Sequence, residues 1–300
     1  MRENRDGRLT TLVYARPCTW HVDPIEKKPL YHFLPGASAF SIATAGCNFE
    51  CLYCQNWEIS QARPEDLESF DMPPEKVVDM AAKSGSSCIA YTYNEPSIFY
   101  EYMYDTCKLA RDSGIRNLDI TNGFLNVEPL IELCRVMDAA NVDLKGYSED
   151  FYQKVCSGQL QPVLDYLVTM KERGVWIEIT NLVVPTLNDR EEMISDMCDW
   201  IVENLGTDCP LHFSRFSPKY KLVHLPYTPV QILERAREIA LEKGIKYVYI
   251  GNVAGHQASN TYCHSCGQML IQRVGFAVLM NKMDGDRCGF CGAKIPGVWS

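Results

Sequence analysis

The chain has 300 residues, 46% of them hydrophobic and 22% charged, which is ordinary for a globular protein with one sizeable core. Its formal net charge of −9 disfavours a nucleic-acid or anionic-membrane partner, since both usually require a basic face. No apolar run approaches the ~20 residues that span a bilayer, and the polar N-terminus does not resemble a signal peptide. We therefore expect a cytoplasmic protein that binds neither nucleic acid nor a membrane.

The fourteen cysteines are the most unusual feature of the composition. In a chain of this length without an export signal, metal ligation explains them better than disulfides do. Seven of them fall into two groups, one near residue 50 and one beyond residue 260. The other seven are scattered, and we interpret them as small buried apolar side chains.

Short β-rich runs alternate with amphipathic helical stretches from residue 38 to about residue 255. The predicted strands are 39–45, 88–93, 116–121, 141–145, 176–184, 211–216 and 246–250. The predicted helices are 74–84, 97–113, 127–137, 162–173, 189–203 and 228–243.

This alternation predicts βαβ units and a parallel sheet. Six units are fewer than the eight of a closed barrel, so we predict an α/β fold with a partial (β/α)6 barrel over residues 38–255. A flat doubly wound sheet is the alternative. Residues 1–37 are predicted to be an extension that packs on the barrel and contains an ordered loop, and residues 256–300 a small separate metal-binding ribbon. In either architecture, ligands bind at the carboxyl ends of the strands.

Three cysteines follow the first predicted strand directly. Cys47, Cys51 and Cys54 have the spacing C-x3-C-x2-C. Three thiolates on one short loop can hold three irons of a cubane [4Fe–4S] cluster and leave the fourth iron open. An open position is where a cofactor or substrate binds, as in catalytic zinc sites. The amino and carboxylate groups of S-adenosylmethionine (SAM) can chelate that iron, and an electron from the cluster can then break a carbon–sulfur bond.

The three-cysteine motif resembles that of the radical SAM superfamily. The similarity extends over nearly the whole chain, in the runs DPIEKKPL (23–30), LPG (34–36), CQNWEIS (54–60), YTYNEP (91–96) and DLKG (143–146) and in the C-terminal cysteine pairs. These runs resemble one branch, the radical SAM proteins of the AmmeMemoRadiSam system, which are relatives of pyruvate formate-lyase activating enzyme. The resemblance implies a 5′-deoxyadenosyl radical, a protein or other large substrate, and a reduced flavodoxin- or ferredoxin-like electron donor.

The resemblance also implies residues that bind the cofactor. In the related activases a Gly-Gly-Glu motif binds the methionine amino group, and Glu95 matches its glutamate, with Tyr93 and Asn94 in place of the glycines. A carboxylate suits an ammonium group that must be oriented. A helix N-cap or first-turn acid is the alternative role for Glu95. Tyr53, the aromatic residue before the last cysteine of the motif, is also expected in the cofactor pocket.

Two further strand ends resemble activase segments. Thr121 and Asn122 belong to a Thr-Asn-Gly run, and Asp143 and Lys145 to an Asp-Leu-Lys run. Lys145 is expected to pair with the cofactor carboxylate, whereas Asp143 and Asn122 are expected to bond ribose hydroxyls or the amine. A plain salt bridge between Asp143 and Lys145, which share one strand face, is the alternative. We predict no catalytic residue beyond the cluster ligands.

Departures from the activase pattern leave a second reaction open. The glycines are replaced, and Thr180 stands where activases tend to place an arginine. Cleavage of a different carbon–sulfur bond, giving a 3-amino-3-carboxypropyl radical or transfer product, is therefore the alternative. We interpret His212 as a structural residue. The gap left by six units, bordered by a loop over residues 146–161 that is expected to move, favours a macromolecular target over a metabolite.

The last segment contains two C-x2-C-G pairs, Cys263 with Cys266 and Cys288 with Cys291, separated by 21 residues. Four thiolates form a closed tetrahedral site, which is typical of a structural zinc ribbon. We predict one structural Zn²⁺ here, outside the active site. Rubredoxin-type iron or an auxiliary iron–sulfur cluster is the alternative.

Overall fold

The main sheet of the computed structural model, which describes residues 1–300, has eight strands. They are β3 (Thr19–Pro24), β4 (Ser38–Ala43), β5 (Cys88–Tyr91), β6 (Arg116–Thr121), β7 (Ala139–Asp143), β8 (Trp176–Val183), β9 (Leu211–Arg215) and β10 (Val248–Gly251). Their order across the sheet is β10–β9–β8–β7–β6–β5–β4–β3, and β4 to β10 are all parallel. The edge strand β3 is antiparallel to its neighbour β4.

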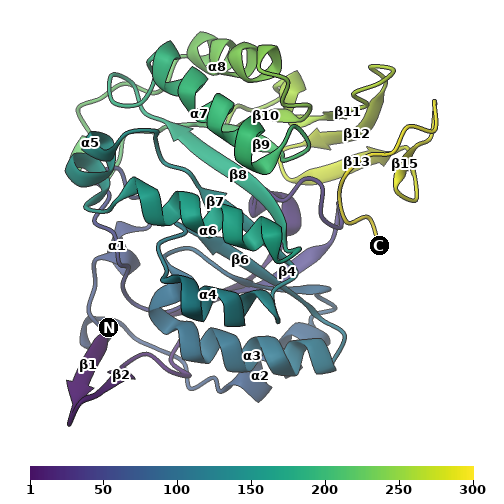
Figure 1. The fold of residues 1–300 in the computed structure, drawn as a ribbon. Coiled ribbons are helices and arrows are strands. Elements are labelled where there is room, and N and C mark those ends of the chain that lie inside the picture. Colours follow the sequence, from purple (N-terminus) through teal and green to yellow (C-terminus); the bar gives the residue numbers. More distant parts are fainter.

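Six helices join the parallel strands and lie in a row on one face of the sheet (Figure 1). They are α2 (Pro74–Lys83), α3 (Tyr100–Asp112), α4 (Val127–Cys134), α6 (Leu160–Glu172), α7 (Glu191–Leu205) and α8 (Val230–Glu242). Each buries an apolar stripe, as α7 does with Ile194, Met197 and Ile201 at helical spacing. None of the helices is long and apolar enough to cross a membrane.

The remaining elements are short. They are the hairpin of β1 (Arg2–Arg5) and β2 (Arg8–Thr11); the helices α1 (Trp57–Ser60) and α5 (Glu149–Phe151); the π-helical turn η4 (Tyr152–Cys156); the 3-10 turns η1 (Ile25–Lys27), η2 (Pro64–Asp66), η3 (Pro96–Phe99), η5 (Tyr220–Leu222) and η6 (Gln257–Ser259); and the C-terminal strands β11 (Thr261–Tyr262), β12 (Met269–Val274), β13 (Ala277–Asn281), β14 (Met283–Asp284) and β15 (Arg287–Cys288).

The predicted α/β fold with six βα units is confirmed. All seven predicted strands are present and pair in sequence order, which is the arrangement of a partial (β/α)6 barrel. The doubly wound alternative is excluded, because the six helices cover only one face of the sheet (Figure 1). Strand β3 is an addition that the sequence analysis did not predict. It precedes the first βα unit and extends the sheet at one edge.

The opposite face of the sheet is covered near its centre by residues 25–34, which we call the inner segment. Three of its side chains, Ile25, Leu30 and Phe33, are buried at 0–1% exposure. They pack on small side chains from four neighbouring strands, namely Ala39, Cys88, Ala90, Leu118 and Ala139. Because side chains alternate along a strand, the intervening Phe40, Ile89 and Tyr91 face the helices instead. Small residues on the inner face therefore leave room for the inner segment.

The C-terminal residues 256–300 form a small module beside β10 (Figure 1). Its core includes Leu270 and Ile271, which pack with Tyr31 of the inner segment and with Tyr249 of β10. Arg273 is 2% exposed and donates to the carbonyl oxygen of Tyr31 at 2.8 Å. The module is thus joined to the inner segment by a buried polar contact as well as by apolar packing.

Candidate functional site

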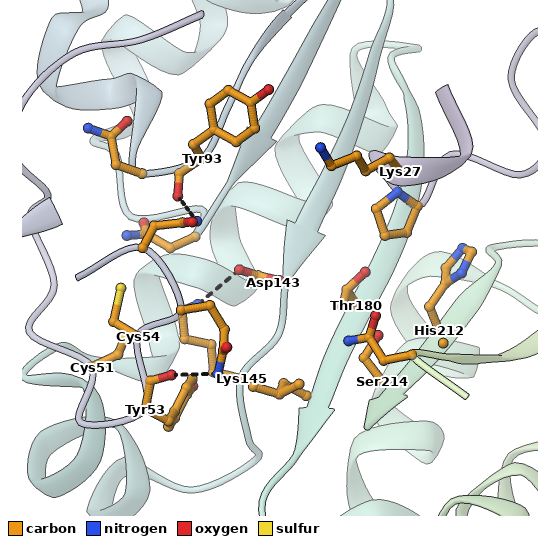
Figure 2. Close-up of a pocket in the computed structure, with 18 of the residues that line it drawn as sticks. Lys27, Cys51, Tyr53, Cys54, Tyr93, Asp143, Lys145, Thr180, His212 and Ser214 are labelled. Atoms are coloured by element: carbon orange, nitrogen blue, oxygen red, sulfur yellow. Dashed lines mark hydrogen bonds and ion pairs between the residues drawn. The ribbon is translucent and has the colours of Figure 1, made fainter. Parts of the chain in front are cut away.

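A cavity of about 450 Å³ opens at the carboxyl ends of the parallel strands. Cys47, Cys51 and Cys54 lie on its wall, on the loop that follows β4. On the opposite wall, Figure 2 shows Lys27 of the inner segment together with Thr180 of β8 and His212 and Ser214 of β9. The three cysteines that the sequence singled out therefore share one chamber with polar groups from the far strands.

The cysteine loop is held from below by the segment that follows β7. The backbone N–H of Glu50 donates to the carbonyl of Cys156 at 2.9 Å, and that of Leu52 to the carbonyl of Val155 at 2.9 Å. This segment, which the sequence predicts to be a loop, contains the helical turns α5 and η4 and is bonded to the cysteine loop; its movement stays a prediction. At its end, Gly158 lies so close to the loop that a Cβ atom there would stand 2.4 Å from the Phe49 ring.

The thiols of the loop are buried or half-buried and have polar neighbours. The backbone N–H of Phe49 lies 3.4 Å from the Sγ of Cys47, and the Oγ of Ser60 lies 3.6 Å from the Sγ of Cys54. Burial raises the pKa of both thiols above its usual value. A bound metal would offset this effect, because its positive charge stabilises the thiolate form.

The donor set of this loop fits a cluster. Three thiolates on one short loop can each bind a different iron of a cubane and leave the fourth iron open. The four C-terminal cysteines, in contrast, have ligand atoms that all lie within 4.8 Å of one another, which suits a single ion.

Tyr93 and Asn94, which follow β5, form the next part of the wall. Tyr93 has a φ of 69°, in the left-handed region that favours glycine. Its hydroxyl donates to Asp23 at 2.5 Å, and the Nζ of Lys28 lies 4.4 Å from its ring centroid. Asn94 donates its Nδ2 to the carbonyl of Gly46 at 2.6 Å, while its Oδ1 is buried without a partner. Asn94 lines the cavity, and an amide oxygen without a partner suits a cationic ligand group.

Glu95 and Thr121 do not line the cavity. The Glu95 carboxylate is fully buried and accepts from the N–H of Ser97 and the hydroxyl of Thr121, both at 2.9 Å, and from the N–H of Asn122 at 2.8 Å. Burial raises its pKa. The contact with Ser97 is the N-cap role that the sequence left open for Glu95. Asn122, in contrast, borders the cavity. Glu95 and Thr121 therefore affect the site indirectly, through the hydrogen bond between Glu95 and the backbone of Asn122.

Asp143 and Lys145 both border the cavity and form an ion pair with 2.9 Å between Oδ2 and Nζ (Figure 2). Burial opposes the charge of Lys145, but Asp143 and the Cys51 thiol hold its pKa well above the usual value. Lys145 is therefore a permanent cation beside the cysteine loop. Tyr53 also borders the cavity, and its hydroxyl lies 3.5 Å from the Sγ of Cys156.

Sequence reasoning set His212 aside as structural, yet it lines the cavity. Its Nε2 lies 2.7 Å from the Oε2 of Glu178, which also accepts from the backbone N–H groups of Tyr31 and His32. Ser214 lies two residues further along β9 and shares the same face. The sequence did contain a signal for both residues. Side chains alternate along the predicted strand 211–216, so residues 212 and 214 share one face near its carboxyl end.

The four C-terminal cysteines form a compact group. The Sγ atoms of Cys263 and Cys291 are 3.7 Å apart and those of Cys266 and Cys288 are 3.8 Å apart. These separations equal the edge of a tetrahedron with ~2.3 Å metal–sulfur bonds, so the four thiols fit one ion. None of the four lines the cavity, but Phe276 of the same module does. The module thus contributes to the cavity wall although its candidate metal centre lies outside it.

Comparisons with known proteins found similar sequences and structures. The family model described as the Radical SAM superfamily matches residues 41–198. An uncharacterised protein of Methanocaldococcus jannaschii is 47% identical over 98% of this chain and 88% of its own length. The pyruvate formate-lyase-activating enzyme of Clostridium pasteurianum is 24% identical over 67% of this chain and 87% of its own length. The structure of Streptococcus suis SuiB bound to precursor peptide SuiA matches 73% of this chain and 48% of that one, with a TM-score of 0.54 and 14% identity.

Proposed function

The chain belongs to the radical SAM superfamily, and from this premise we propose that it cleaves SAM reductively to a 5′-deoxyadenosyl radical and acts on a protein substrate. The predicted class of enzyme and its kinship with activating enzymes are confirmed. Assignment to the AmmeMemoRadiSam branch stays a prediction. The observation that carries the proposal is the single chamber that Cys47, Cys51 and Cys54 share with Asn94 and Lys145.

Each cavity residue has a proposed task toward the cofactor. When bound by the three cysteines, a [4Fe–4S] cluster supplies the electron that breaks the SAM carbon–sulfur bond. Lys145 pairs with the SAM carboxylate, and the free Oδ1 of Asn94 accepts from its ammonium.

The remaining predicted residues contact or position the cofactor. Asp143 and Asn122 bond its polar groups, and Tyr53 packs beside it. Glu95 holds the backbone N–H of Asn122 and is itself bonded by the Thr121 hydroxyl, so both residues position Asn122 rather than contact the cofactor. This assignment keeps the residues that the resemblance implied but gives two of them a positioning role.

A protein substrate is supported by the relatives. One is named for activating pyruvate formate-lyase, and another is a putative glycyl-radical enzyme activating enzyme. We propose the same class of target, a glycyl segment of a partner protein, and a flavodoxin- or ferredoxin-like protein as the electron donor. We also propose that the C-terminal cysteines bind one structural Zn²⁺, which the 3.7 and 3.8 Å sulfur separations support.

Anaerobic protein, reduced and mixed with labelled SAM and cell extract, tests the proposal. We expect 5′-deoxyadenosine as the product, a low-temperature EPR signal from the cluster, and a radical or label in a protein of the extract. Cys51→Ala should abolish all three, whereas Cys107→Ala, which changes a buried cysteine of α3, should retain them. Formation of methylthioadenosine instead would establish the 3-amino-3-carboxypropyl alternative. Turnover that requires a dialysable small molecule would refute the protein substrate.

A further inference from the structure

Two buried side chains of β9 border the cavity without a hydrogen-bond partner for their cavity-facing atoms. His212 is 2% exposed and Ser214 is 8% exposed. The imidazole bonds Glu178 through Nε2 alone, and neither its Nδ1 nor the Oγ of Ser214 bonds any group of the chain. Neither atom is among the enclosed, unpartnered polar atoms of the chain, so both are open to the cavity, where a ligand can reach them. Two such atoms on one strand face, in side chains that are otherwise buried, point to a ligand that bonds both.

The orientation of His212 is fixed on every side. The ring is stacked on Tyr249 with 4.9 Å between centroids, and it meets the edge of Tyr31 at 4.8 Å. Glu178 accepts its Nε2–H at 2.7 Å and is itself anchored by the backbone N–H of His32 at 2.7 Å. In the tautomer that donates to Glu178 through Nε2, Nδ1 carries a lone pair that can accept a hydrogen bond from a ligand. The packing holds this atom in one place.

The surroundings favour an uncharged ligand group. The positions beside His212 on the neighbouring strands are Thr180 and Tyr249, neither of them charged. The cations that line the cavity, Lys27 and Lys145, are each paired with an aspartate at 2.8 and 2.9 Å. A free carboxylate or phosphate would therefore meet no unpaired positive charge at this end of the cavity.

The spacing matches the peptide group. Residues two apart on a strand stand about 6.6 Å from one another, which is also the repeat of an extended peptide. The lone pair of His212 suits an amide N–H, and the hydroxyl of Ser214 suits a carbonyl oxygen. Gly251 of β10 keeps the space clear, because a Cβ there would stand 2.7 Å from the Ser214 Oγ.

We propose that His212 and Ser214 form a subsite for a backbone amide of the substrate, at the end of the cavity opposite the cluster cysteines. The subsite rests on the proposed function, since it names where the glycyl segment of the protein target docks. Glu178 acts as a positioning residue, because it sets the tautomer and direction of His212. Phe276 of the C-terminal module closes the same end of the cavity with an apolar side chain.

The experiment uses two small probes and the SAM-loaded holoenzyme. One probe is N-acetylglycine N-methylamide, and the other is its ester isostere, in which the glycine N–H is replaced by oxygen. Ligand-observed NMR titration gives the dissociation constant of each. We expect the amide to bind the natural chain at least five-fold more tightly than the ester. His212→Gln keeps a donor for Glu178 but has nothing at the Nδ1 position, so the preference should fall below two-fold.

Further variants test the other half of the subsite. Ser214→Ala and Gly251→Ala should each weaken binding of both probes at least three-fold. Ser86→Ala, which removes a buried hydroxyl bonded to Ser84 far from the cavity, should change nothing. SAM affinity and the EPR signal, recorded on the same samples, should stay within two-fold for all variants.

Three outcomes would overturn the subsite. They are equal affinity for amide and ester in the natural chain, an unchanged preference in His212→Gln, and no saturable binding of either probe. The test needs no knowledge of the protein target. It can therefore fail while SAM cleavage and labelling of a protein succeed, which would leave the proposed function intact and refute only the subsite.

Discussion

Tyr93 keeps a left-handed backbone that costs a residue with a side chain roughly 1–2 kcal/mol relative to glycine. Its own side chain opposes that cost, since the hydroxyl bonds Asp23 and the ring faces the ammonium of Lys28. The replacement of glycine in the motif, which put close backbone approach in doubt, is thus compatible with a glycine-like backbone path. Residue type alone could not reveal this, because the compensating partners lie about seventy positions away in the sequence.

The ion pair of Lys145 gives the first prediction. Lys145→Ala should weaken SAM binding by about 1.5–3 kcal/mol, the usual scale for a hydrogen bond to a charged group. Equilibrium binding of labelled SAM measures the change, and iron content should stay constant. The matched control is Lys154→Ala, which removes an exposed cation paired with Asp150. Equal affinity of Lys145→Ala and the natural chain for SAM would show that Lys145 forms only the salt bridge with Asp143.

Asp119 gives a pH-dependent prediction. Burial, and then the nearby Glu95 carboxylate, raise the pKa of Asp119 to about 8, whereas in the unfolded chain it is about 3.9. Between these values the folded protein binds more protons at this site, so its contribution to the free energy of unfolding decreases as pH rises. Asp119→Asn should remove this contribution to the pH dependence of the unfolding free energy. Urea unfolding of the natural chain and of the variant at pH 6 and pH 8.5 checks this prediction. If the unfolding free energy changes between the two pH values by the same amount in both proteins, the prediction is contradicted.

At the scale of elements, the sequence was sufficient for the parallel strands and helices. Period-two and period-3.6 patterns are local, so seven strands and six helices could be read from their own residues. Strand β3 was missed, and the face on which the predicted ordered loop of the extension packs could not be read, because both depend on distant partners such as Ala39 and Ala90. Glu95 illustrates the same limit within the site. A carboxylate at a strand end can face the cavity or turn inward to cap the next residues, and its type does not decide which.

The contact between α5–η4 and the cysteine loop gives the third prediction. Gly158→Ala would bring a Cβ to 2.4 Å from the Phe49 ring, so the loop must shift. We expect a loss of about 1–3 kcal/mol in unfolding free energy and lower iron content per chain. The double variant with Phe49→Leu, which shortens the opposing side chain, should recover much of the iron content. Normal iron content in Gly158→Ala alone would show that the loop tolerates the shift.

At the scale of the whole molecule, the inner segment meets the C-terminal module on the inner face of the sheet. Arg273 contacts Tyr31 and lies 3.6 Å from Glu26, and Phe33 pairs with Val298. Tyr31 and Glu26 border the cavity, as Phe276 does. The C-terminal module is therefore also a support of the cavity wall, a role that its cysteine spacing did not predict.

Metal loss from the module tests that support. Cys266→Ser combined with Cys291→Ser should reduce bound zinc to below one tenth per chain. Hydrogen exchange should then become faster in residues 25–34 as well as in the module, because Arg273 no longer holds Tyr31 firmly. Exchange in α3, which does not touch the module, serves as the internal control. Faster hydrogen exchange in the module alone would show that the inner segment is stable without the module.

The contact between the inner segment and the C-terminal module also sets an order of events during synthesis. The ribosome releases residues 25–34 early, yet Arg273, the partner of Tyr31, lies 242 positions later in the chain. Contacts across so many positions form late, since the intervening chain must first be closed into a loop. The chamber around the cysteines is therefore completed only after the C-terminal module has emerged. Delivery of iron and sulfide would follow that step, and chains that lack the module would expose their thiols without retaining a cluster.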